Sequence, residues 1–431
     1  MKAFSVWLLL LAITCRGLAQ QGDTAVMLAA RYFRQADSAG SRNAIWKQPL
    51  YGPMLLVDPQ SRTTYANMPD SKGIFTSLGE GIYKGQLPKE VMVANTSINW
   101  QGQWWTVILW PLPADRDERL SLMLHESFHR IQNKLGLPAY SPTIDHLATT
   151  NGRIYLLLEL QALKSALAKP IDQRKVDLTH ALLFRKKRQE LFPATFDHER
   201  QLEMNEGLAE YTGVLLGRPS DSIRQHLYTE IDRAATRLSL IRAMPYITGP
   251  VYGYLLYEKS PAWTHAVDSN ASFSALIGKY YQVTVPKTTI TAEWVKLEKR
   301  YKGDRIIRTE KIKEKARQAQ TAVYTRLFTR YPVLVINLQK MNIVFNPNNL
   351  FDLGQLGTVY PTAEIKDVWG KLKVENGGML MQNWQVITLP ARDNLCVKDG
   401  IVQANGWSLE LNKHWYIEKK DSLHFVLLKR E

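Results

Sequence analysis

The sequence is poor in cysteine, and this limits how the protein can be stabilised. The 431-residue chain holds two cysteines, Cys15 and Cys396. Cys15 falls within residues 1–19, which read as a secretory signal peptide: Lys2 precedes an apolar run, and small residues precede an expected cleavage after Ala19. Cleavage would leave Cys396 alone, which excludes an internal disulfide and places the stability of the fold in core packing.

The sequence also lacks long apolar runs. After the signal peptide, no segment approaches the roughly 20 consecutive apolar residues that a transmembrane helix needs, and the apolar run before Cys15 is itself short. The residues just before Cys15 (AITC) lack the leucine and the small residue of a lipidation signal, which argues against a lipid anchor. We therefore expect a soluble, exported protein, either secreted or periplasmic.

Signals of several other enzyme classes are missing as well. The sequence contains no G-x-S-x-G, no Walker-type phosphate loop and no paired C-x-x-C.

The formal net charge is +15. Loss of the signal peptide removes Lys2 and Arg16 and no acid, which leaves a net charge of +13. In an exported protein this excess favours contact with anionic envelope polymers or lipid head groups over nucleic acid, or it simply aids solubility; the sequence leaves both open.

The hydrophobic pattern predicts an α+β first domain, residues 20–294. Residues 24–37 have helical spacing, and β-rich runs between about residues 50 and 110 predict a small sheet whose last two strands form a hairpin at Gln101-Gly102. Residues 115–290 then read as mainly helical. The first of these helices begins at Asp115, and the later ones are expected at residues 146–168, 175–192, 199–216, 221–243 and 250–258.

The composition changes again after residue 294. Residues 295–330 are highly charged with few large apolar residues, which predicts a solvated connecting helix. From residue 331 to residue 431, short alternating runs are separated by turn signals such as Asn405-Gly406. We expect a C-terminal all-β domain there.

The strongest chemical signal is an H-E-x-x-H motif made by His125, Glu126 and His129. Asp115, in a capping-box arrangement, and Gly136 predict the start and the end of the helix that carries it. Residues four apart share a helical face, so both imidazoles can reach one Zn²⁺ while Glu126 polarises a water molecule at the metal. The alternative is a buried helix that carries two histidines by chance.

A catalytic zinc site needs a third protein ligand. The metzincin pattern requires glycine and histidine where this chain has Gln132 and Leu135, which excludes that class. Residues 202–213, LEMNEGLAEYTG, resemble the gluzincin metallopeptidases, and NEGLAEY in particular is similar to a segment of their aminopeptidase branch. This resemblance implies that Glu206 is the third ligand and that Glu210, one turn later, holds a zinc-bound imidazole.

The resemblance extends to MPYITG, residues 244–249, which is similar to the P-Y-x-x-G segment of the same branch. It implies that Tyr246 donates a hydrogen bond to the oxyanion of the reaction. Tyr252, Tyr254 and Tyr257 lie nearby in sequence and could take that role instead, and ordinary packing would also explain these aromatic residues.

The resemblance covers about residues 50–290 and has two departures. The segment between His129 and Glu206 is longer than in the aminopeptidase branch, so one or two helices lie between the ligand helices. The chain also lacks the G-x-M-E-N segment with which that branch holds a substrate amine, so aminopeptidase activity is not implied. The strand QWWTVILW, just before the motif helix, is expected to run along the cleft or beside the strand that does.

Together these features predict a zincin-like domain with a small mixed sheet and a helical lower lobe, acting as an exported zinc metallopeptidase on peptides or proteins. Two alternatives stay open: an inactive zincin-fold binding or scaffold protein of the envelope, and a zinc amidase with a non-peptide substrate.

The charged stretch at residues 185–188 (RKKR) is expected to be a solvated helix face. His146, His180 and His198 are expected to be structural or surface residues.

Overall fold

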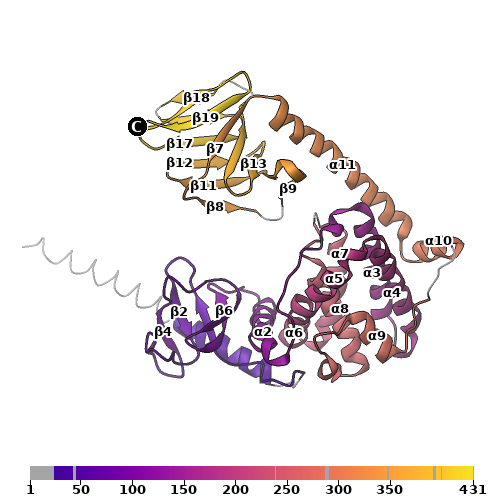
Figure 1. Cartoon of the computed structure of the whole chain (residues 1–431). Coiled ribbons are helices and arrows are strands. Elements are labelled where there is room, and N and C mark those ends of the chain that lie inside the picture. The colour runs from indigo at the N-terminus through magenta and orange to yellow at the C-terminus, as the bar shows by residue number, and fades with distance from the viewer. Residues whose placement is uncertain are drawn as a thin grey trace, which may run out of the picture. The chain divides into compact units, whose positions relative to one another are not determined.

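The computed structural model describes residues 24–41, 45–237, 239–286, 291–346, 349–391, 395–398 and 400–430. The expected signal peptide, with Cys15, lies outside these residues. The described chain is mixed α+β, with an N-terminal sheet, a helical middle and C-terminal sheets, which confirms the predicted order of structure (Figure 1). It divides into two compact units, residues 1–306 and 307–431. Among the described helices, none combines the length and hydropathy needed to cross a bilayer.

The first unit opens with a six-stranded mixed sheet. Its strands are β1 (Met54–Val57), β2 (Thr63–Ala66), β3 (Thr76–Ser77), β4 (Tyr83–Gln86), β5 (Thr96–Trp100) and β6 (Gln103–Leu109), in the spatial order β3-β4-β2-β1-β6-β5. β1 and β6 are parallel, and the other pairs are antiparallel. The predicted hairpin is confirmed: Gln101 and Gly102 both have positive φ, 55° and 77°, as a type I′ turn requires.

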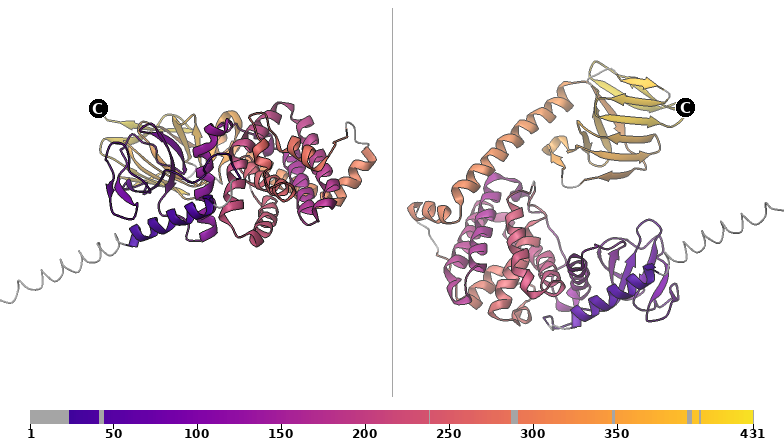
Figure 2. Two further views of the ribbon diagram at one scale, coloured as in Figure 1. Left: turned by 90° about the horizontal axis from the view of Figure 1, so that it is seen from below. Right: turned by 180° about the vertical axis from the view of Figure 1, so that it is seen from behind.

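Two helices pack on one face of this sheet. The helix at residues 24–41 runs beside the strands (Figure 2), and α2 (Arg116–Gln132) carries the H-E-x-x-H motif. Phe33 from the first helix and Met123 from α2 share one buried cluster with Met54 and Ile108 of the sheet. Because β6 leads almost directly into α2, the sheet fixes where the motif helix starts.

The ends of α2 follow the local sequence signals. The Asp115 side chain accepts a hydrogen bond from the backbone N–H of Glu118 at 2.9 Å, so the predicted N-cap is confirmed. After α2 comes a short 3₁₀ turn, η1 (Asn133–Leu135), and Gly136 then stops the helical path in a left-handed conformation with φ 69°.

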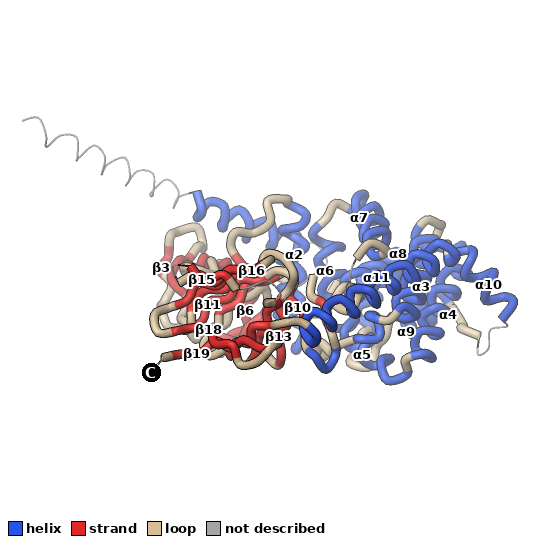
Figure 3. Tube along the Cα trace, turned by 90° about the horizontal axis from the view of Figure 1, so that it is seen from above, coloured by secondary structure: helices blue, strands red, loops and turns tan. Residues whose placement is uncertain are grey.

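The middle of the chain is helical, as expected, and Figure 3 shows these helices in blue. The main helices are α3 (Thr150–Leu167), α4 (Lys175–Leu191), α5 (Phe196–Leu202), α6 (Leu208–Gly217), α7 (Ser220–Ala234), α8 (Met244–Lys259), α9 (Phe273–Tyr281) and α10 (Thr291–Arg300). Short 3₁₀ turns are η2 (Asp145–Ala148), η3 (Ile171–Gln173), η4 (Pro193–Thr195) and η6 (Trp263–Ala266). The helix expected at residues 199–216 is interrupted by a π-helical turn, η5 (Glu203–Gly207).

Two glycines allow α2 and α6 to pack with their backbones in contact. A Cβ added to Gly213 would lie 2.4 Å from the carbonyl oxygen of Ser121, and one added to Gly217 would lie 2.5 Å from the Ser121 nitrogen. Any side chain there would force the helices apart. Since Ser121 is one turn before His125, these glycines bring the motif histidines close to the second helix.

The second unit is built on α11 (Gly303–Arg330), which begins just before the boundary. Together with the end of α10, α11 occupies the segment expected as one connecting helix. Phe328 of α11 packs in a small buried cluster with Val359 and Leu380 of the strands that follow.

The strands of the second unit form two sheets. They are β7 (Val333–Asn337), β8 (Asn342–Phe345), β9 (Phe351–Asp352), β10 (Thr358–Tyr360), β11 (Ala363–Asp367), β12 (Gly370–Val374), β13 (Met379–Gln382), β14 (Val386–Pro390), β15 (Cys396–Lys398), β16 (Ile401–Ala404), β17 (Trp407–Leu411), β18 (Trp415–Lys419) and β19 (His424–Lys429), with a 3₁₀ turn, η7 (Gly354–Leu356). The orders are β18-β19-β7-β14-β13-β10-β9 and β15-β16-β17-β12-β11-β8. Leu334 and Leu389 of the first sheet and Leu372 and Leu409 of the second share one buried core, so the expected C-terminal β region is confirmed.

Candidate metal centre

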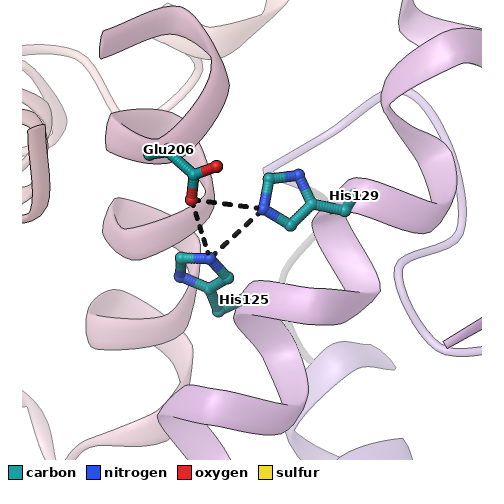
Figure 4. Close-up of side chains that lie close together, drawn as sticks. All are labelled: His125, His129 and Glu206. Carbon is teal, nitrogen blue, oxygen red and sulfur yellow. Dashed lines mark hydrogen bonds and ion pairs between the residues drawn. The ribbon is translucent and has the colours of Figure 1, made fainter. Parts of the chain in front are cut away.

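The structure brings together the three residues expected to bind metal. Ligand atoms of His125, His129 and Glu206 all lie within 4.8 Å of one another. The two Nε2 atoms are 3.2 Å apart, and Oε2 of Glu206 lies 3.4 Å from Nε2 of His125 and 3.6 Å from Nε2 of His129. Figure 4 shows both imidazoles on one helix and the carboxylate facing them from another.

Local structure explains how each ligand reaches this point. His125 and His129 are one helical turn apart on α2 and therefore share a face. Glu206 lies in the π-helical turn η5, a conformation that occurs often at functional sites because it redirects side chains within a helix. A Cβ added to Gly249 of α8 would lie 2.3 Å from the Cα of Gly207, so α8 packs directly on this turn.

The outer nitrogens of the imidazoles are each held by an acceptor. Nδ1 of His125 lies 2.9 Å from Oε2 of Glu210, and Nδ1 of His129 lies 2.8 Å from Oε1 of Gln132. Nε2 of Gln132 donates to Oδ1 of Asn205 at 2.8 Å and to the carbonyl of Pro138, which fixes the orientation of the amide. Both Nδ1 atoms therefore donate outward, which turns the Nε2 atoms toward each other and toward Glu206, where they can bind a proton or a metal ion.

The residues fit a tetrahedral zinc ion. Three atoms that all offer lone pairs to one point repel one another unless a cation lies between them. A tetrahedral ion with ligands at about 2.0–2.1 Å holds neighbouring ligand atoms roughly 3.4 Å apart. The separations of 3.2, 3.4 and 3.6 Å among His125, His129 and Glu206 lie around that value. Two imidazoles and one carboxylate are also a donor set that zinc accepts in catalytic sites.

The protein's own charges already favour positive charge at this point. Burial opposes protonation of His125, but hydrogen bonds to Glu206 and Glu210 outweigh it and raise its pKa to about 10. Burial likewise opposes ionisation of Glu206, but hydrogen bonds from the imidazoles hold its pKa well below the ordinary value. Burial raises the pKa of Glu126, against the charges of the two histidines. The cluster thus combines the buried Glu126 with the half-buried Glu206 and Glu210, and together these carboxylates attract a cation.

Of the four candidate tyrosines, Tyr246 is the one placed at the centre. Its hydroxyl donates to Oε2 of Glu206 at 2.7 Å, and its ring stacks on the His125 ring at 5.8 Å with an interplanar angle of 2°. Burial and then the charge of Glu206 raise the pKa of Tyr246. Tyr252 is instead buried elsewhere, where it donates to Glu159. Tyr254 and Tyr257 stack on each other and line a different cavity.

Sequence reasoning missed three polar residues around the ligands. Gln132 orients His129, as described above. Nδ2 of Asn205 donates to Oε1 of Glu206 at 3.1 Å, and the Ser141 hydroxyl donates to the same oxygen at 3.3 Å. The position of Gln132, three residues after His129 on the same helix, was a usable signal for its role, whereas Ser141 lies in a loop whose path no local pattern predicts.

The expectation of a solvated helix face at residues 185–188 is wrong for both arginines. Arg185 and Arg188 are 3% and 0% exposed. Arg185 binds both oxygens of Glu203, at 2.6 and 2.8 Å, and donates to Glu159 at 2.8 Å. Arg188 binds Glu159 at 2.7 Å and both oxygens of Glu199. Charge-assisted, bidentate pairs compensate for the burial of these groups.

This buried ionic network reaches the metal centre through η5, because Glu203 belongs to the same π-helical turn as Glu206. His146 completes the other end, with Nε2 2.6 Å from Oε1 of Glu199, and is a buried structural residue. His180 contacts the hydroxyl of Tyr301 at 2.7 Å. The exposed His198 lies 3.2 Å from the carbonyl of Thr143.

Comparison of the chain with protein-family models, with curated proteins and with solved structures gave no match.

Proposed function

We propose that the protein is an exported zinc-dependent metallohydrolase, and that it cleaves peptide bonds. The observation that carries the proposal is the geometry of the ligand set. His125, His129 and Glu206 come from two helices and place three donor atoms at the edge lengths of a zinc tetrahedron. Their outer atoms are oriented by Glu210, Gln132 and Asn205, as supporting partners of metal ligands are in other zinc sites.

The side chains around this set suit hydrolysis. A bound zinc ion would polarise the substrate carbonyl and lower the pKa of a coordinated water. Glu126, adjacent to His125 on α2, would take a proton from the attacking water and pass it to the leaving nitrogen. Burial raises the pKa of the Glu126 carboxyl above its ordinary value. The Tyr246 hydroxyl, bonded here to Glu206, would donate to the oxyanion as charge develops there.

A peptide is the substrate class that the neighbouring sheet supports. β5 (Thr96–Trp100) is an edge strand of the first sheet, beside β6, and it also contacts α2. An edge strand has unpaired backbone donors and acceptors to which an extended peptide can bind as an additional strand. Such a peptide would run beside the helix that supplies Glu126 and both histidines.

The proposal is tested by separating metal binding from catalysis. The purified protein should contain close to one zinc per chain and should cleave a mixed-peptide library in a chelator-sensitive way. Glu126→Gln should keep the metal and lower the rate by a factor of about 10² to 10⁴ or more. Glu118→Gln, on an exposed position of the same helix, is the matched control and should retain full activity.

Three outcomes would redirect the proposal. Undiminished hydrolysis by metal-loaded Glu126→Gln would refute the mechanism. Absence of zinc from the wild-type protein would favour a binding or scaffold role. Zinc with no cleavage of any peptide, but chelator-sensitive release of amine from other amides, would favour a non-peptide amidase.

A further inference from the structure

The first unit contains a cavity of about 720 Å³ that includes none of the proposed metal-centre residues. Its walls come from the helix at residues 24–41, the start of α2, the junction between α6 and α7, and the C-terminal half of α8. The volume lies within the range of about 300–1,000 Å³ that small-molecule sites occupy. The cavity is therefore large enough to hold a ligand of several functional groups.

The charge of the lining is of one sign. Four arginines line the cavity, Arg31, Arg34, Arg116 and Arg218, and no carboxylate belongs to the lining that the structure describes. Acids occur only beside it. Glu80 lies 3.6 Å from Arg34, both side chains being well exposed, and Asp117 accepts from its chain neighbour Arg116 at 3.0 Å. Asp115 interacts with Arg218 through its charge alone.

Arg218 is the residue that most clearly lacks a partner. Its Nε is buried and has no hydrogen-bond partner among the described residues. Arg119 and Arg130 also have a buried Nε without a partner, but their terminal nitrogens bind backbone carbonyls. Arg185 and Arg188 each bind two carboxylates. Unlike these arginines, Arg218 forms no side-chain hydrogen bond or ion pair with the residues that the structure describes, so its terminal guanidinium nitrogens are available to an anion in the cavity.

Two further features of the wall suit an anion. α7 begins at Ser220 beside Arg218, and no side chain caps its first turn, because its N-cap residue is Pro219. The amide groups at the start of this 15-residue helix therefore add partial positive charge to the cavity wall. Tyr254 and Tyr257, whose rings stack on each other, add aromatic side chains to the same wall.

We propose that this cavity binds a multiply charged oxyanion, a phosphate- or carboxylate-bearing ligand held by Arg31, Arg34, Arg116 and Arg218. Guanidinium groups bind both kinds of oxyanion with paired hydrogen bonds, and several of them around one cavity select a ligand with more than one negative charge. The aromatic part of the wall accommodates an uncharged part of the same ligand. This site does not depend on the metal centre or on its proposed reaction.

The test uses the full-length mature protein and isothermal titration calorimetry with inorganic pyrophosphate and with citrate. Each probe should bind at one site, and Arg218→Gln should weaken binding by a factor of at least ten. Arg31→Gln, which changes an exposed side chain on another helix, gives a second measurement if Arg218→Gln fails to fold. Arg233→Gln removes an exposed arginine at the other end of α7, and it should bind like the wild type.

A parallel arm identifies the source of the oxyanion. Vesicles of phosphatidylcholine with phosphatidylglycerol that displace pyrophosphate would assign the site to a lipid head group, whereas failure to displace it would assign the site to a free ligand. The proposal is overturned if neither probe nor vesicle binds the wild-type protein. It is equally overturned if Arg218→Gln and Arg31→Gln fold normally and bind as tightly as Arg233→Gln.

Discussion

Replacement of Arg185 by methionine should destabilise the helical part of the first unit strongly. Methionine can occupy much of the space of the arginine stem, so the change removes charge and hydrogen bonds more than volume. Arg185 gives Glu203 two hydrogen bonds and Glu159 one, and its guanidinium lies 4.7 Å from the centre of the Tyr252 ring. Without Arg185, Glu159 still has its hydrogen bonds with Arg188 and Tyr252. Among the described residues, Glu203 then has the Thr248 hydroxyl as its one side-chain partner.

The loss of stability in Arg185→Met depends on whether Glu203 stays charged or takes up a proton. A carboxylate left buried without its cation typically costs about 3–5 kcal/mol. Glu203 can avoid that cost by taking a proton, but protonating a carboxyl of ordinary pKa 4.5 at pH 7 itself costs roughly 3.4 kcal/mol. The two estimates agree, so we expect Arg185→Met to lower the free energy of unfolding by about 3–4 kcal/mol. Adding Glu203→Gln removes the unpaired charge and should recover at least about 1 kcal/mol.

Urea unfolding followed by far-UV circular dichroism measures these differences. Lys187→Met changes a partly exposed neighbour on the same helix and should alter stability by no more than about 0.5 kcal/mol. Zinc affinity should fall together with stability in Arg185→Met, because Glu203 and Glu206 share one π-helical turn. A loss below about 1 kcal/mol, or a double variant no more stable than Arg185→Met alone, would refute this account of the network.

Three other predictions concern packing, metal affinity and pH. Gly249→Val should lower the free energy of unfolding by about 1–3 kcal/mol and weaken zinc binding, because the valine side chain would clash with the backbone of η5. An unchanged melting temperature and an unchanged zinc affinity would contradict this close contact. Gln132→Ala removes the acceptor for Nδ1 of His129 and should weaken zinc binding by about 10- to 100-fold in a competitive chelator titration, with the fold intact by circular dichroism. Burial alone would raise the pKa of Glu199, but the charge of Arg188 outweighs it and holds the pKa well below 4.5, so the unfolded chain takes up the proton first as the pH falls. Stability should therefore decrease below about pH 4.5, by up to about 1.4 kcal/mol per pH unit from this group, and urea midpoints of Glu199→Gln should depend less steeply on pH in that range; equal slopes would exclude the assignment.

The sequence could predict those parts of the structure that depend on neighbours in the chain. The motif helix follows from the Asp115 cap, the spacing of its apolar residues and Gly136, and the hairpin follows from Gln101-Gly102. The grouping of His125 with His129 likewise needs only helical geometry. Local rules of this kind act over a few residues, so they hold whatever the rest of the fold does.

The buried ionic network could not be predicted in the same way. Arg185 and Arg188 stand in a run of four basic residues, which is typical of a solvent-exposed face, and nothing near them in sequence shows that their partners are Glu159, Glu199 and Glu203. A weak signal did exist, since Glu159 interrupts the apolar run LLLELQAL. Acids isolated in apolar runs need buried partners, and Glu159 finds its partners, Arg185 and Arg188, on another helix.

The two histidines of the candidate metal centre differ in how strongly they can donate electrons to a metal ion. Nδ1 of His125 faces the carboxylate of Glu210, whereas Nδ1 of His129 faces the neutral amide of Gln132. A carboxylate partner draws the Nδ1 proton away more strongly and makes Nε2 of His125 the more basic nitrogen. A metal ion held here would therefore be bound more strongly by His125 than by His129.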